Sequence, residues 1–109
     1  MADTVDPIRA RFGPSVPQAH VLSALVVVAG AQAGLSVERI QDAAMAVELL
    51  LGAGPARQRT VGLAIHPGVM EVSISDVEAG WLDGRRQMLD VLVSGIELSG
   101  SGVRVRVEA

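Results

Sequence analysis

Few side chains in this sequence could carry out chemistry, and their types exclude several kinds of site. The chain has no cysteine and no lysine, since all nine basic residues are arginine. Disulfides, thiolate metal sites, lysine nucleophiles and the lysine of a phosphate-binding P-loop are therefore excluded. The two histidines, His20 and His66, lie far apart and lack a His-x-x-x-His spacing, so they do not predict a metal site.

Carboxylates are the remaining candidates for acid–base or binding chemistry. Glu48 lies near the end of an apolar segment, and Asp76 follows a segment of alternating residues, with Gly80 four positions later. A lone Glu on a helix is ordinarily a solvated surface residue, and an Asp at a strand end is ordinarily a turn residue. The sequence also contains no Gly-x-Ser-x-Gly, no Walker sequence and no Ser/His/Asp set. By themselves these residues define no active site.

Composition and charge are those of a small globular domain. The chain has 109 residues, half of them hydrophobic, and a formal net charge of −3. This length predicts one domain over residues 1–109, and the charge predicts no broad attraction to nucleic acid or to an anionic membrane. Phe12 and Trp81 are the only aromatic residues, so the core must be aliphatic. Trp81 fits a partner interface and a cap on the core equally well.

The segment from residue 15 to residue 37 carries no formal charge and contains the apolar run Val21–Ala29. Asp3 and Asp6 spoil the basic leader of a signal peptide, and prolines interrupt the segment. The run is also far shorter than the ~20 residues that a membrane span requires. We therefore expect a cytoplasmic protein in which this segment forms a core helix covered on more than one side.

Hydrophobic periodicity predicts the elements that must position these residues. Three helices are expected over residues 17–33, 37–51 and 85–96. Pro17 suits the start of the first helix, Gly34 its end, and Ser36 the N-cap of the second. Strands are expected over residues 8–12, 60–65, 70–75 and 103–108, the middle two as a hairpin.

The order of the expected elements is β-α-α-β-β-α-β, with a loop over residues 76–84. Strands with one apolar face and amphipathic helices predict an α/β (α+β) two-layer sandwich. The sheet would be mixed and four-stranded, with three helices on one face. In the third helix the inward residues would be Met88, Leu89, Leu92 and Ile96.

Residues 34–51, GLSVERIQDAAMAVELLL, resemble the helix that carries the catalytic groups of histidine-kinase-like ATPases, above all the bacterial anti-sigma-factor serine kinases. Those kinases show Gly-Leu-Ser, an acidic helix start and then Ala-Val-x-Glu-Ala-x-x-Asn. Ala46 and Val47 match this run, while Leu49 stands at the Glu position and Ala53 at the Asn position. Residues 69–76 and 101–107 extend the resemblance, the latter being similar to a closing Gly-Thr-x-Val strand.

The resemblance implies a nucleotide-binding scaffold that has lost its catalytic groups. Leu49 cannot take up a proton, and Ala53 cannot ligate Mg²⁺, which prefers oxygen ligands. Glu48 is one position away from the catalytic place, about 100° round the helix. A shift of register that used Glu48 would put Gly52 at the Asn position.

The adenine-binding motif of that family is only partly kept. Asp-x-Gly-x-Gly corresponds here to Asp76-Val77-Glu78-Ala79-Gly80, in which a glutamate replaces the middle glycine. The resemblance implies that Asp76 could still read adenine, and that the mobile lid over the phosphates is missing.

Three hypotheses follow. The first is a non-catalytic regulatory domain, without a cofactor, that binds a sigma factor, an anti-anti-sigma domain or a second copy of itself through its very apolar first helix. The second is an ATP-binding serine protein kinase whose displaced site uses Glu48, Asp76 and Gly80 with Mg-ATP. The third is an unrelated small α/β domain with an accidental likeness. We take the first as the main hypothesis.

Overall fold

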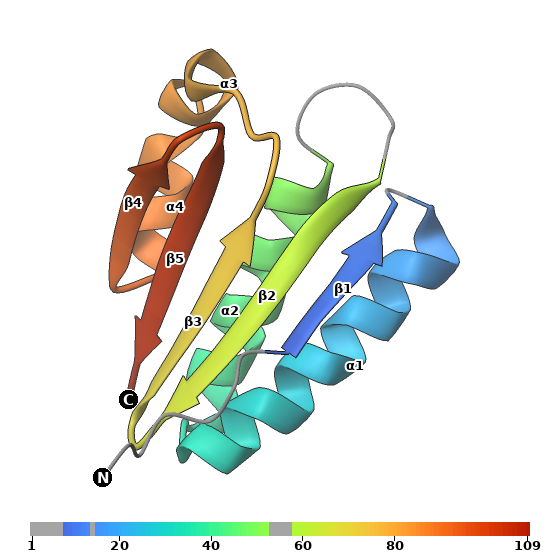
Figure 1. The fold of residues 1–109 in the computed structure, drawn as a ribbon. Helices are drawn as coiled ribbons and strands as arrows, with labels where there is room; N and C mark the ends of the chain where they lie inside the picture. Colours follow the sequence, from blue (N-terminus) through green and yellow to red (C-terminus); the bar gives the residue numbers. More distant parts are fainter. Residues whose placement is uncertain (1–7, 14, 53–57) are drawn as a thin grey trace, which may run out of the picture.

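A computed structural model describes residues 8–13, 15–52 and 58–109 of the chain. Its helices are α1 (Val16–Ala33), α2 (Val37–Leu51), α3 (Ala79–Asp83) and α4 (Arg86–Leu92). Its strands are β1 (Ile8–Phe12), β2 (Arg59–His66), β3 (Val69–Ile74), β4 (Gly95–Ser99) and β5 (Gly102–Glu108) (Figure 1).

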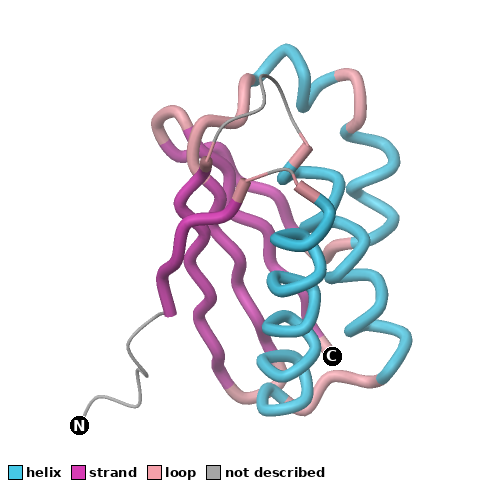
Figure 2. Tube along the Cα trace, turned by 90° about the vertical axis from the view of Figure 1, so that its right-hand side faces the viewer, coloured by secondary structure: helices cyan, strands magenta, loops and turns pink. Residues whose placement is uncertain are grey.

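The strands form one antiparallel sheet in the order β1-β2-β3-β5-β4, and the helices lie on one of its faces (Figures 1 and 2). The α1 helix packs on β1, β2 and β3, whereas α2 packs on β3 and β5 and contacts both α1 and α4. The opposite face of the sheet is left uncovered (Figure 2). The two-layer arrangement of helices on a sheet is therefore confirmed.

The predicted number and order of elements, and the mixed sheet, are wrong. The described residues form five antiparallel strands and four helices, in the order β-α-α-β-β-α-α-β-β. The helix predicted over residues 85–96 ends at Leu92, because Val93 takes an extended conformation with φ −125° and ψ 159°. Ile96 then lies in β4, where it alternates with the exposed Glu97. The short helix α3 occupies part of the expected loop.

Local sequence signals predict the end of α1 and the start of α2 correctly. Gly34 ends α1 in the left-handed region at φ 82°, where a glycine has no steric penalty. The side chain of Ser36 accepts a hydrogen bond from the backbone N–H of Arg39 at 3.2 Å and so caps α2. The expected hairpin is β2–β3, and its turn contains Gly68 at φ 75°.

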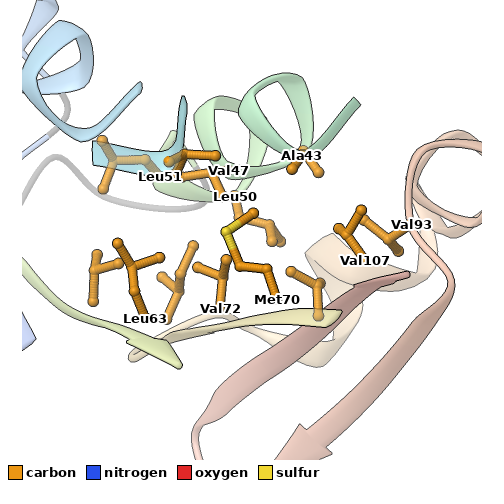
Figure 3. Packing of buried hydrophobic residues seen from close by; sticks show 14 of the residues in the cluster. Ala43, Val47, Leu50, Leu51, Leu63, Met70, Val72, Val93 and Val107 are labelled. Carbon is orange, nitrogen blue, oxygen red and sulfur yellow. The ribbon is translucent and has the colours of Figure 1, made fainter. Parts of the chain in front are cut away.

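The core lies between the sheet and the helices. On α2 the inward residues are Ala43, Val47, Leu50 and Leu51, and they face Leu63, Met70 and Val72 of the sheet (Figure 3). Leu89 and Leu92 of α4 are buried as predicted, but Met88 is 57% exposed, because α4 turns that side away from the sheet. Trp81 is partly buried against the core, with the Arg85 guanidinium 4.6 Å from its ring centroid.

Candidate functional site

Glu48, the candidate catalytic base, ties the two long helices together. Its Oε1 accepts a hydrogen bond of 2.9 Å from the hydroxyl of Ser23 on α1. Its neighbour Leu49, at the family's catalytic position, is half-buried against the core. Ala53, at the metal-ligand position, lies outside the described residues. The geometry of Glu48 is that of a contact between helices on the exposed side of α2.

Asp76 lies in the turn that joins β3 to α3, and Gly80 lies at the start of α3. Asp76 is half-buried and has φ 59°, a left-handed conformation that Asp tolerates better than most residues do. The N–H of Val77 donates to the carbonyl of Ser101 at 3.0 Å, which holds this turn against the β4–β5 hairpin. Gly80 is exposed in the first turn of α3, with open space where a Cβ would stand.

The structure thus places Asp76 and Gly80 close together in sequence, on the turn before α3 and in α3 itself, and Glu48 at the contact between α1 and α2. Two hollows, of about 510 and 310 Å³, lie over the sheet strands, and none of these three residues lines either of them. Among the described residues, no three histidine, aspartate or glutamate side chains gather closely enough to hold a metal ion.

Helix α1 is covered on two sides, by the sheet and by α2, as predicted. Its remaining side is exposed, because α1 lies at the side of the helical layer (Figure 1). It buries Leu22, Val26, Ala29 and Ala33, whereas Val21, Val27 and Val28 are 56%, 47% and 56% exposed.

We call the exposed, uncharged side of this helix the α1 outer face, and it consists of Val21, Ala24, Val27, Val28 and Ala31. At 100° per residue these five positions fall within an arc of about 120°. The polar residues His20 and Gln32 stand at its two ends and carry no acidic or guanidinium group. Such a stripe of apolar side chains in water is typical of a surface that another molecule covers.

No helix in the described part of the chain is long and apolar enough to cross a membrane. The apolar residues of α1 are instead divided between the core and the α1 outer face. The sequence signal for this division was present, because residues 22, 26, 29 and 33 recur at helical spacing and suffice for one buried side.

A cluster of polar groups joins α2, α4 and β5 on the helical side of the molecule. The Arg39 guanidinium donates to the carbonyl of Glu108 at 3.0 Å, to the Asp42 carboxylate at 2.9 Å and to the Ser94 hydroxyl at 3.0 Å. The Ser94 hydroxyl in turn accepts the N–H of Glu108 at 2.9 Å. These hydrogen bonds hold the elements together, so we assign the cluster a structural role and no catalytic or binding role.

One ionisable group on the uncovered face is perturbed. The hydrogen bond that the Arg106 guanidinium donates to the Glu108 carboxylate, together with the negative charge of that carboxylate, raises the pKa of Arg106. Because arginine is already ionised throughout the physiological range, this shift creates no pH switch.

Comparison with models of known protein families and with curated proteins finds no match to this chain. The likeness to histidine-kinase-like ATPases stays a prediction from the residues quoted above.

Proposed function

We propose that this protein is a non-catalytic regulatory domain that binds a protein partner through the α1 outer face. The observation that carries the proposal is the exposure of three valines on an 18-residue helix without a formal charge. Burying such a surface against a partner releases water from apolar area, which is the main source of association free energy.

The partner class follows from the resemblance of residues 34–51. On that basis we propose a sigma factor or an anti-anti-sigma domain, with a second copy of this chain as the other occupant of the same surface. The hydrocarbon side chain of Leu49, packed on the core, supports a function that needs neither ATP nor Mg²⁺. The hydrogen bond between Glu48 and Ser23 supports a structural use of the nearest carboxylate.

The test compares capture of proteins from the native host by the wild-type chain and by the double variant Val21→Glu/Val28→Glu. Glutamate is a better helix former than valine, so this variant is expected to fold normally. It should lose the captured partner, because two charges would have to be desolvated in the interface. Met88→Glu is the matched control, since Met88 is 57% exposed on α4, and it should retain the partner.

Light scattering on the same three proteins shows whether the partner is a second copy. Equal capture by the wild type and the double variant, or a strictly monomeric wild type that captures nothing, would remove the proposal.

Calorimetry with Mg-ATP tests the opposing function. Binding heat at millimolar nucleotide that Asp76→Asn weakens would replace this proposal with an ATP-binding serine kinase that uses Glu48, Asp76 and Gly80.

A further inference from the structure

The uncovered face of the sheet carries a row of residues that stand directly opposite one another on four strands. Arg9 of β1 pairs with Gly62 of β2, Gly62 with Ser73 of β3, and Ser73 with Arg104 of β5. Across these four strands two arginines flank two small residues, and Glu97 of β4 continues the row opposite Arg104. The larger hollow, of about 510 Å³, lies over this row.

The residues on the floor of the hollow have small side chains, although the Cβ of a larger residue at Gly62 would not clash with its neighbours. A Cβ built on Gly62 would lie 3.8 Å from the Ser73 Cβ and 3.9 Å from the Arg9 Cγ, which is ordinary contact. The backbone of Gly62 is also not in the left-handed region. A glycine inside a strand weakens the strand, and this one is not needed for backbone shape or close approach. Its effect is to leave space, as does the neighbouring Ala64.

The rim of the hollow has unused hydrogen-bond donors. Arg9 has no ion pair within the described part of the chain, whereas Arg104 forms an ion pair with Glu71, with 3.9 Å between its Nε and the carboxylate and no hydrogen bond between them. The hydroxyl of Ser73 also makes no hydrogen bond to any described residue. Two arginines and one glutamate give this rim a net charge of +1.

We propose that this hollow binds a small organic anion, with its phosphate or carboxylate group between Arg9 and Arg104 and its body over Gly62. A guanidinium presents a planar fork of N–H donors that matches the oxygens of such groups. A volume of about 510 Å³ falls within the usual range of small-molecule sites. The site lies on the opposite layer from α1, so it is independent of the proposed partner surface.

The test is a titration of the ¹⁵N-labelled 109-residue chain, followed by NMR, with inorganic pyrophosphate in one arm and glutarate in the other. We expect saturable amide shifts at Gly62, Ser73 and Arg104 with a dissociation constant below about 1 mM for at least one probe. Tighter binding of pyrophosphate would indicate a phosphorylated ligand, and tighter binding of glutarate a carboxylic acid.

Variants separate a specific site from general attraction of anions. Arg9→Gln and Arg104→Gln should each weaken binding roughly tenfold, as expected for loss of one charge-assisted hydrogen bond. Arg11→Gln removes the same charge from the same strand outside the hollow and should leave binding unchanged. Gly62→Val should abolish binding by filling the floor, while amide signals outside the hollow keep their positions.

Two results would overturn the proposal. One is the absence of saturable amide shifts with either probe at concentrations up to about 10 mM, which is ten times the expected dissociation constant. The other is equal weakening by Arg9→Gln and Arg11→Gln, which would show that only net charge attracts the probe.

Discussion

Gly102, the first residue of β5, illustrates at the scale of one residue how closely two strands approach. A Cβ at this position would meet the backbone carbonyl oxygen of Ile74 at 2.7 Å and the Ser75 Cα at 3.3 Å. Because these are backbone atoms, they cannot turn aside as a side-chain tip can. We expect Gly102→Ala to lower the free energy of unfolding by about 1–3 kcal/mol, the usual cost of overpacking.

Chemical denaturation of the purified variants checks this expectation. The matched control is Gly95→Ala, at the start of β4, where a Cβ would meet no atom within 4 Å. That variant should be as stable as the wild type or slightly more stable, since alanine restricts the unfolded chain. Equal losses at both glycines would contradict the steric explanation.

Single residues also show what sequence reasoning can and cannot predict. Gly34 and Ser36 were identified correctly, because caps depend on chemistry within a few neighbouring residues. The hollow beside Gly62 was missed, because its arginines come from β1 and β5, which the sequence separates by some ninety positions and the sheet brings to one row. The small residues of the hairpin were the available signal.

Arg39 shows, at the scale of elements, how one side chain fixes the mutual positions of α2, α4 and β5. Its side chain is 25% exposed and donates to acceptors on all three segments, including the Glu108 carbonyl. Lysine has the same charge, but it lacks the planar fork that reaches several acceptors at once. Arg39→Lys should therefore lower the free energy of unfolding by about 1.5–3 kcal/mol.

Thermal or urea denaturation measures this loss, with Arg86→Lys as control. Arg86 lies 4.0 Å from Asp90 on the exposed side of α4, and surface pairs of this kind contribute about 0–1 kcal/mol. If Arg39→Lys had the same free energy of unfolding as the wild type, the hydrogen bonds of Arg39 would not be what holds these elements together.

The error in the predicted elements arose where two periodicities overlap. Leu89, Leu92 and Ile96 fit a helical spacing, yet Ile96 and Leu98 also alternate with Glu97 as a strand does. Pairing with β5 decides between them, because β4 completes backbone hydrogen bonds that a longer helix would leave open at that edge. The β4–β5 hairpin is local in sequence, but β5 is held in place by its pairing with β3, which is distant in sequence. A prediction from local periodicity cannot include that second pairing.

The molecule as a whole consists of one layer of helices on one sheet. The alternation of apolar residues in the strands and their helical spacing elsewhere predict this two-layer arrangement. For α1, the spacing of residues 22, 26, 29 and 33 predicts one buried side, but the sequence does not show which of the remaining apolar residues stay exposed. Helix α1 lies at one side of the helical layer, with α2 as its neighbour in that layer (Figure 1). Surplus apolar residues on such a helix are where we place the function.

The buried apolar residues of the described chain form one continuous cluster, which predicts a single cooperative unfolding transition. Trp81, the only tryptophan, reports on α3 at one end of the molecule, while far-ultraviolet circular dichroism reports on the long helices. Urea unfolding followed by the two signals should give the same midpoint. Leu50→Ala, at a fully buried position between α2 and the sheet, should lower both midpoints together by the equivalent of about 2–5 kcal/mol.

Val91→Ala is the control for this experiment, because Val91 is 78% exposed on α4 and its truncation leaves no cavity. If tryptophan fluorescence changed at a lower urea concentration than circular dichroism, α3 would unfold on its own. The turn that carries Asp76 and Gly80 would then be an independently mobile unit, which is the property a nucleotide-binding segment would need and a rigid partner-binding scaffold would not. Coincident transitions, in contrast, favour the scaffold.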